Sequence, residues 1–295
     1  MSMRVGLQMY TVRNMYNKDP LGTLEKVSDV GYKTVELVNH RANIDPGSGI
    51  GIPANKLKAK ADELGIKIIG GQVMPESESM VEEFYKQEDT VKSIIEYYGE
   101  LGSSSISIPI DYFRTKDYLL ERCSLYNKIG KVCNEFGMRL LYHNHYHDFQ
   151  FLDGKVTMDL FLENTDPEYV GIELDTYWTM RGAYDPVEKI REYGKRIDVI
   201  HQKDFPLKYV QYLNAWAFLD QKKTMDSETF RSVMEPEYFI EIGDGIMKIQ
   251  SIIDACNEFN IGYMLVEQDF STLSEIDSIK RSLSNLKKMR DLTWD

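Results

Sequence analysis

The feature of this sequence that most constrains its fold is a repeated alternation of short apolar runs with longer amphipathic segments. Short runs rich in Val, Ile and Leu are typical of strands that are buried on both faces of a parallel sheet. Eight such runs are present. The strands that we predict are Arg4–Met9, Thr34–Val38, Lys67–Val73, Ser105–Ile110, Arg139–Asn144, Val170–Asp175, Ile197–Gln202 and Tyr263–Gln268.

Segments with helical spacing lie between these strands, and several of them end at a glycine directly before the next strand. The helices that we predict are Leu21–Val30, Pro53–Leu64, Thr90–Leu101, Lys116–Phe136, Val187–Tyr193, Ile249–Phe259 and Leu273–Met289. An open doubly wound sheet has the same local pattern, but eight strands in one chain of 295 residues favour closure. The predicted fold class is α/β, a (β/α)8 TIM barrel formed by a single domain over residues 1–295.

One predicted connection is much longer than the others. It follows the seventh strand, covers residues 205–241 and contains the aromatic residues Tyr209, Tyr212, Trp216, Phe218 and Phe230. A long loop inside a compact domain is usually functional, and this one leaves the barrel on the face where substrates bind. A helical insertion that packs against a partner subunit fits the same composition equally well.

Charge and hydropathy limit the partners of the chain. The formal net charge is −12, which disfavours nucleic acid and, more weakly, anionic membranes. No apolar run approaches the roughly 18 residues of a membrane span, and the N-terminus lacks a signal-peptide pattern. Three cysteines without CxxC spacing predict buried thiols rather than disulfides. We expect a cytoplasmic protein that acts on a small molecule.

Titratable residues are concentrated at the carboxyl ends of the predicted strands, where barrel enzymes carry their catalytic groups. Four of the five histidines lie there. His143 and His145 are two residues apart on one strand, so their side chains share a face, and the same holds for Glu173 and Asp175. The ends of the next two strands carry His201, Lys203 and Glu267.

Imidazoles and carboxylates that converge from four successive strands predict a divalent metal site, because these groups suit Mn²⁺, Zn²⁺, Fe²⁺ or Co²⁺. A lone buried histidine such as His201 is more often a hydrogen-bonded core residue. Acids at equivalent strand ends, Asp175 and Glu267, favour the metal interpretation here.

Polar residues on other strand ends are candidates for substrate contact. Gln8, Glu36 and Gln72 can hydrogen-bond sugar hydroxyls, or they can fill polar layers inside the barrel. Lys203 follows His201 by two residues, so it points the same way and can stabilise a developing enolate or alkoxide. The alternative for Lys203 is a salt bridge to a neighbouring acid.

Three further candidates rest on weaker signals. Asp148 follows the fifth strand closely and is either a catalytic or substrate-contacting group or a plain loop residue. Trp178 and Trp216 can form an apolar wall for a sugar ring, and core packing is the alternative, which we favour for Trp178.

The order of several short segments resembles the sugar phosphate isomerase/epimerase family, the xylose-isomerase-like TIM barrels. The segments are GLQMYTVR, GYKTVEL, YHNHYHDF, TDPEYVGIELDTYW, HQKDF, GDG and VEQD. They run from Gly6 to Asp269, and the histidines on strand five are similar to those of the HNH-type branch of the family.

The resemblance implies a divalent metal, with Mn²⁺ as the first choice and Zn²⁺, Co²⁺, Fe²⁺ or Mg²⁺ as alternatives. Family members bind it through Glu, Asp, His and Glu, and Asp175, His201 and Glu267 take the last three places. The first Glu has no counterpart on strand five, so His145 or His143 is expected as the fourth ligand, with His145 as our choice. His143 is otherwise a candidate for substrate contact.

The resemblance also implies a sugar isomerase or epimerase that abstracts a proton next to a carbonyl and forms an enediolate. His145 or Glu267 would act as the base, Lys203 would assist, and Asp148 is the candidate for a second acid–base group. The same branch resembles inosose dehydratases and lyases that act on 3-keto-glycosides, so elimination from a keto-sugar is an alternative outcome. A non-catalytic barrel subunit is a third reading, and family members often form homo-oligomers.

Overall fold

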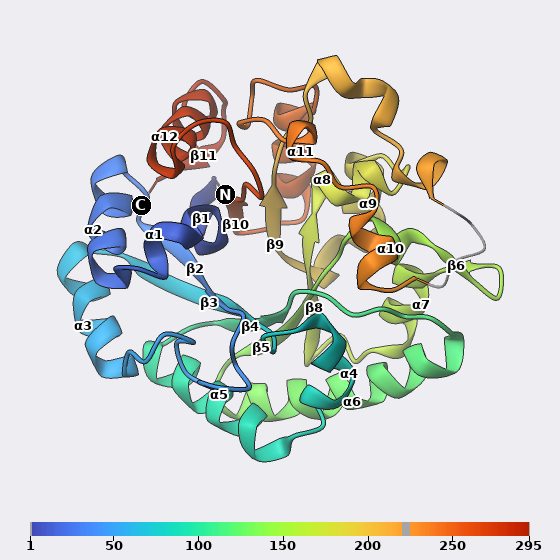
Figure 1. Cartoon of the computed structure of the whole chain (residues 1–295), viewed down its shortest axis with the longest axis horizontal. Coiled ribbons are helices and arrows are strands. Elements are labelled where there is room, and N and C mark those ends of the chain that lie inside the picture. Colours follow the sequence, from blue (N-terminus) through green and yellow to red (C-terminus); the bar gives the residue numbers. More distant parts are fainter. Residues whose placement is uncertain (1, 220–224, 295) are drawn as a thin grey trace.

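All eight predicted strands are present, and each pairs in parallel with its neighbours around a closed barrel (Figure 1). The computed structural model describes residues 2–219 and 225–294. Closure comes from β10, which pairs with β9 on one side and with β1 on the other. The barrel strands are β1 Met3–Gln8, β2 Thr34–Asn39, β3 Lys67–Val73, β4 Ser105–Ile108, β5 Arg139–His143, β8 Val170–Asp175, β9 Ile197–Gln202 and β10 Tyr263–Val266.

The predicted helices surround this barrel, and their ends follow local chemistry. Asp19 caps the first long helix by accepting a hydrogen bond from the amide of Gly22, and Pro20 occupies its first turn. Gly65 and Gly102 end two helices with φ of +63° and +75°, which favours glycine. The bounds are α2 Pro20–Val30, α3 Ala54–Leu64, α5 Glu88–Leu101, α6 Lys116–Glu135, α9 Pro186–Tyr193, α11 Ile249–Glu258 and α12 Glu275–Leu286.

Several short elements were not predicted, because they are too short for a helical period to appear in the sequence. Among them, α8 begins directly after β8, where Asp175 caps it by accepting a hydrogen bond from the amide of Trp178 at 2.7 Å. These short elements include α1 Arg13–Tyr16, α4 Val81–Phe84, α7 Thr157–Asn164, α8 Thr176–Arg181, the hairpin β6 Phe151–Leu152 and β7 Lys155–Val156, and β11 Leu292–Thr293.

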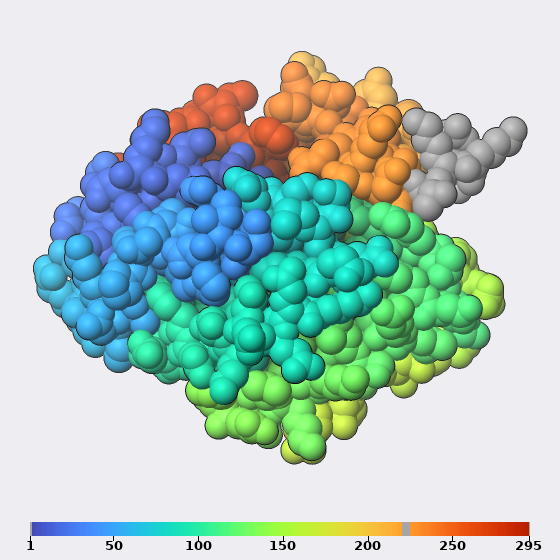
Figure 2. Space-filling model, turned by 60° about the horizontal axis from the view of Figure 1, so that its bottom comes forward, coloured from blue at the N-terminus to red at the C-terminus, as the bar shows by residue number. Residues whose placement is uncertain are grey.

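The long connection after β9 folds into short helical turns over the mouth of the barrel. Asp204 holds the end of this connection against the barrel, because the Asp204 carboxylate accepts hydrogen bonds from the amides of Gly243, Gly245 and Met247. In the space-filling view this orange segment lies beside the cyan surface that follows β3 (Figure 2). The turns are η5 Leu207–Tyr212, η6 Ala215–Phe218, α10 Ser227–Arg231 and η7 Pro236–Tyr238, and residues 220–224 of the predicted loop lie outside the described residues.

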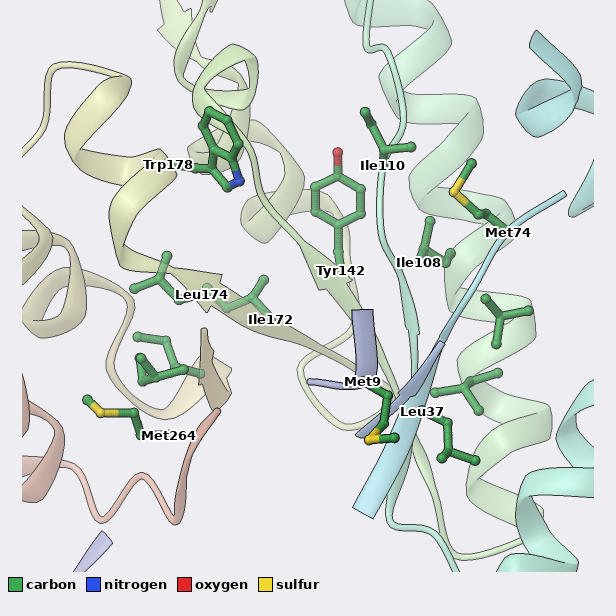
Figure 3. Close-up of a cluster of buried hydrophobic side chains, with 14 of the residues drawn as sticks. Met9, Leu37, Met74, Ile108, Ile110, Tyr142, Ile172, Leu174, Trp178 and Met264 are labelled. Atoms are coloured by element: carbon green, nitrogen blue, oxygen red, sulfur yellow. The ribbon is translucent and has the colours of Figure 1, made fainter. Parts of the chain in front are cut away.

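The two-residue period of the strands separates an outer core from the barrel interior. Outward-facing side chains such as Tyr142, Ile172 and Leu174 pack in the large apolar core between strands and helices (Figure 3). A second, small apolar cluster forms a layer inside the barrel from Ile69, Leu141, Val199 and Leu265. Two residues further along three of these strands stand His143, His201 and Glu267, so alternation alone places a polar layer above the apolar one.

Two predictions about the rest of the chain can be compared with the structure. Cys123, Cys133 and Cys256 are buried free thiols, as predicted. Among the described residues, no helix combines the length and the apolar character that crossing a bilayer requires.

Candidate metal centre and substrate cavity

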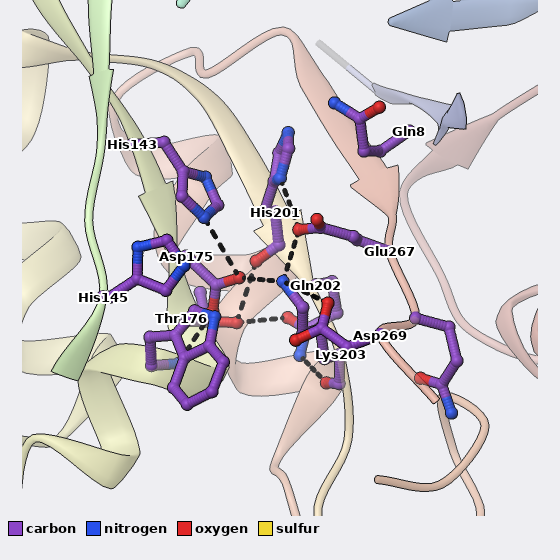
Figure 4. A network of polar contacts seen from close by, with 12 residues as sticks. Gln8, His143, His145, Asp175, Thr176, His201, Gln202, Lys203, Glu267 and Asp269 are labelled. Atoms are coloured by element: carbon purple, nitrogen blue, oxygen red, sulfur yellow. Dashed lines mark hydrogen bonds and ion pairs between the residues drawn. The ribbon is translucent and has the colours of Figure 1, made fainter. Parts of the chain in front are cut away.

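Four buried side chains converge at the mouth of the barrel, and we call them the mouth cluster. They are His143 from β5, Asp175 from β8, His201 from β9 and Glu267, which directly follows β10. One donor atom of each lies within 4.8 Å of the others. Figure 4 shows the four side chains pointing toward one another. Two imidazoles and two carboxylates at this separation can share a first-row divalent cation.

Lys203 supplies positive charge to the acids of the mouth cluster. Its Nζ lies 2.6 Å from Oδ2 of Asp175, donates a hydrogen bond to Oε2 of Glu267 and is 3.8 Å from Oδ1 of Asp269. Burial works against the charge on this ammonium, but Asp175 and Asp269 outweigh it and raise the pKa of Lys203. The ammonium therefore stays charged at neutral pH in the ion-free site.

Three carboxylates thus surround one ammonium, and the pKa values of Glu267 and Asp269 shift in opposite directions. Burial acts to raise the pKa of Glu267, but the charges of Lys203 and His201 outweigh it and hold that pKa well below its usual range. Burial also raises the pKa of Asp269, to about 6, because Lys203 is further away and Glu267 repels a second negative charge. Of Glu267 and Asp269, Asp269 titrates closer to neutral pH.

A second group of acids, Glu36 and Glu173, lies next to His201, and we call it the acid pair. Nε2 of His201 is 2.9 Å from Oε2 of Glu36 and 3.2 Å from Oε1 of Glu173, while its Nδ1 is 2.7 Å from Oε2 of Glu267. Burial lowers the pKa of His201, but Glu173 and Glu267 outweigh it, so the pKa is raised. An ion bound at Nδ1 would displace one proton, and the acid pair would keep Nε2 protonated and oriented.

Neutral donors satisfy the acid pair. Gln8 donates from Nε2 to Glu36 at 2.5 Å, Gln72 donates from Nε2 to Glu173 at 2.9 Å, and Oγ of Ser107 lies 3.2 Å from both acids. Burial and the charge of Glu173 raise the pKa of Glu36 well above its usual value. The pair therefore carries one negative charge rather than two.

A cavity of about 440 Å³ opens above the mouth cluster. Its wall includes His143 and Glu267 of the cluster, together with Gln72, Asp269 and Phe230. This volume suits a small ligand, and polar groups converge at its base. Of the three polar candidates on the early strands, Gln72 lines the cavity. Gln8 and Glu36 lie beneath the cavity, in the polar network around His201.

His145, our choice for the fourth ligand, does not join the mouth cluster, and the alternative residue His143 holds that position. The strand ends at His143 and the chain then turns into η3, Tyr146–Phe149, so the two-residue alternation stops. The ring of His145 packs 5.3 Å from that of Trp178 and 5.1 Å from that of Phe230, and it lines the cavity. Burial lowers the pKa of His145 well below its usual value, so the ring is neutral.

The remaining candidates lie away from the cavity wall. Asp148 is buried and accepts hydrogen bonds from the hydroxyl of Tyr142 at 2.8 Å and from the amide of His145 at 2.7 Å. Trp178 is fully buried behind His145. Trp216 lines a different cavity of about 530 Å³.

Several residues of the cavity wall were not among the predicted site residues, and Asp269, Arg231 and Glu78 are three of them. Asp269 could have been found, because it follows Glu267 by two residues and so continues the same alternation. Arg231 on α10 and Glu78 after β3 line the cavity and contact each other through an ion pair. Arg231 ends a five-residue helix and Glu78 begins a three-residue 3-10 helix, and both elements are too short to show a helical period in the sequence.

Comparisons with known proteins agree with this architecture. The match to a curated inosose dehydratase of Geobacillus kaustophilus is 28% identical over 144 residues, and it covers 48% of this chain and 43% of the relative. A solved sugar phosphate isomerase/epimerase of Parabacteroides distasonis superposes with a TM-score of 0.76 at 22% identity, over 99% of this chain and 96% of the other. An L-ribulose 3-epimerase superposes with a TM-score of 0.67 at 13% identity, over 97% and 94% of the chains.

The fold and the site define a class, the (β/α)8 barrels that carry buried imidazoles and carboxylates at the carboxyl ends of their strands. A family model described as the xylose isomerase-like TIM barrel matches residues 24–289. The chain belongs to this family. The matched region spans less than half the length of the inosose dehydratase, and the two solved structures share the fold at low identity.

Proposed function

We propose that this protein is a divalent-metal-dependent enzyme that removes a proton next to the carbonyl of a small sugar, and that it isomerises or epimerises that sugar. One observation carries the proposal. The four donor atoms of the mouth cluster lie within 4.8 Å of one another at the base of a cavity that suits a small molecule.

The residues fit a metal with nitrogen and oxygen ligands. Nδ1 of His201 faces Glu267, and Nε2 of His143 lies 3.9 Å from Oδ2 of Asp175, so these two ring nitrogens and two carboxylates would hold the ion. Mn²⁺ is our first choice, with Zn²⁺, Co²⁺, Fe²⁺ and Mg²⁺ as alternatives. When bound, the ion would act as a Lewis acid toward the substrate carbonyl.

The protein's own groups would handle the proton and the developing negative charge. Glu267 reaches the cavity and, with its lowered pKa, is ionised at neutral pH, so it can accept the proton from carbon. The Lys203 ammonium beside it can donate a hydrogen bond to an enolate oxygen. His145, neutral and on the cavity wall, can hold or return a proton at a second position.

Elimination of water is a second candidate outcome. It shares the first step, because loss of the proton next to the carbonyl is followed by departure of a β-hydroxyl group instead of reprotonation. The curated relatives with significant similarity that we compared are inosose dehydratases, which favours this outcome over glycoside cleavage.

Deuterium exchange tests the shared first step. The protein is incubated in D₂O with Mn²⁺ and a panel of ketoses, inososes and 3-keto-glucosides, and the label is located by NMR. We expect exchange at a carbon next to the carbonyl, loss of exchange in chelator, and recovery with Mn²⁺ or Co²⁺. Product analysis then separates isomer, epimer and dehydrated product.

Two variants provide the matched comparison. Glu267→Gln removes the base and one ligand, and we expect it to abolish exchange, whereas Glu63→Gln changes an exposed glutamate on α3 and should leave exchange intact. A wild-type protein that binds no divalent ion, or that exchanges equally well in chelator, would contradict the proposal.

A further inference from the structure

His40, directly after β2, lines the mouth cavity but belongs to neither the mouth cluster nor the acid pair. Its ring packs beside that of Tyr10, with 5.4 Å between the ring centroids. Its Nε2 is buried and has no hydrogen-bond partner among the described residues. A buried polar atom without a partner is rare in a folded protein, and a ligand in the cavity can supply the missing bond.

The cavity has a second imidazole in the same condition. Nδ1 of His145 is also buried and without a hydrogen-bond partner among the described residues. His145 follows β5, three strands around the barrel from β2, so the two rings approach the cavity from different sides. Two unpartnered ring nitrogens on separate walls indicate a ligand with several hydrogen-bonding groups around its frame.

The protonation state of His40 suits a hydroxyl group. Burial lowers the pKa of His40 to about 4, although Glu267 and Glu78 act in the opposite direction. The ring is therefore neutral at pH 7 and offers one donor and one acceptor nitrogen. A hydroxyl group can both donate and accept, whereas a phosphate at this pH mainly requires donors and positive charge.

The charges around the cavity disfavour an anionic substrate. Arg231 is the permanently charged cation among the described residues of the wall, and its guanidinium contacts Glu78. Glu78 also accepts hydrogen bonds from the hydroxyls of Tyr112 and Ser227, which fixes the carboxylate in place. The wall carries four acids, namely Glu76, Glu78, Glu267 and Asp269.

We propose that His40 binds a hydroxyl group of the substrate, and that the surrounding wall selects an uncharged polyol over its phosphorylated counterpart. The inference rests on the proposed function to the extent that it places the substrate in the same cavity. It adds the substrate class and a residue that recognises it, neither of which follows from the metal ligands.

Calorimetric titration of the Mn²⁺-loaded protein tests this without requiring turnover. The uncharged probes are D-fructose, D-tagatose and scyllo-inosose, and the phosphorylated probes are D-fructose 6-phosphate and D-tagatose 6-phosphate. We expect at least one uncharged probe to bind and each phosphorylated ketose to bind more weakly than its parent. His40→Ala should weaken binding of the best uncharged probe by about tenfold, the value of one hydrogen bond to a buried group.

Three further variants sharpen the result. His40→Gln keeps one donor and one acceptor and should recover part of the affinity, while Arg41→Gln, a change to the exposed neighbouring residue, should bind like the wild type. Glu78→Gln frees Arg231 and should strengthen binding of the phosphorylated probes. Metal content, measured on each variant, should not change.

Each contrary outcome is distinct. Phosphorylated ketoses that bind more tightly than their parents, uncharged probes that all fail to bind, or a His40→Ala variant with wild-type affinity would overturn the inference. The same samples are scored for deuterium exchange. Binding of an uncharged probe that depends on His40 but leads to no exchange would count against the proposed function and would leave this inference standing.

Discussion

Two groups of carboxylates meet at His201, and they are neutralised in different ways. The acid pair, Glu36 and Glu173, receives hydrogen bonds from uncharged amide and hydroxyl groups and also faces the imidazole of His201. In the mouth cluster, Asp175 and Glu267 depend on the ammonium of Lys203. The same residue type therefore stands in two environments a few ångströms apart.

The difference indicates separate roles. Carboxylates held by neutral donors and by the charge of His201 need no further cation, so the acid pair is suited to orienting that imidazole. Carboxylates paired with the buried ammonium of Lys203 can contact a divalent ion instead, since both supply positive charge at the same place. We expect the mouth cluster to bind the ion and the acid pair to hold a ligand in position.

The largest effect should come from removing the residue that the two groups share. His201→Ala should weaken Mn²⁺ binding by about 100- to 1000-fold, because structural Zn²⁺ sites gain about 10–16 kcal/mol over four ligands, or about 2.5–4 kcal/mol for each. Calorimetry and elemental analysis measure the loss. Retention of wild-type metal affinity would show that the two groups do not act through His201.

Removing the ammonium should destabilise the ion-free protein. Lys203→Met leaves Asp175 and Glu267 buried without a counter-charge, so the free energy of unfolding in chelator should fall by about 3 kcal/mol. Mn²⁺ should restore most of this stability, because the ion replaces the missing charge. Urea unfolding with and without Mn²⁺ measures both effects, and a variant as stable as the wild type in chelator would mean that the mouth cluster needs no cation.

Asp269, which lies beside the mouth cluster next to Lys203, should make the stability depend on pH. The folded-state pKa of Asp269 is raised to about 6 from the unfolded value of about 4, so the folded protein binds more protons between these values. The free energy of unfolding in chelator should therefore fall by about 2 kcal/mol as the pH rises from 4 to 6. Asp269→Asn should flatten this part of the curve, and an unchanged slope would assign the titration to another group.

The smallest effect should come from the acid pair. Glu173→Gln keeps the shape of the side chain but removes the charge that faces Nε2 of His201, and we expect Mn²⁺ affinity to fall by about tenfold. The variant should still bind the ion at high concentration and still exchange deuterium. A loss as large as that of His201→Ala would place Glu173 among the ligands and remove the distinction between the two groups.

Most of the fold could be predicted from the sequence, because strand and helix signals are local. The predicted strands Lys67–Val73, Val170–Asp175 and Ile197–Gln202 have the same bounds in the structure. Errors fell on short elements such as α7 and α8, which are stabilised by contacts with the barrel and have little periodicity of their own.

The site residues could be predicted where side chains keep alternating between the two faces of a strand, and could not be predicted where that alternation stops. Asp175, His201 and Glu267 were assigned together, and the structure brings them together. The choice of His145 over His143 does not match the cluster, which contains His143, because the end of β5 between them depends on the turn that follows. Whether the three ligate an ion stays a prediction.

The sequence by itself determined the barrel and the inward-facing polar residues at its mouth, because the two-residue alternation of side chains can be followed within each strand alone. The tertiary structure decided which of those residues meet, through the stagger between neighbouring strands and the turn after β5. It also brought Arg231 of α10 against Glu78 across the cavity. Contacts between segments so far apart in the chain depend on loop paths that no local pattern encodes.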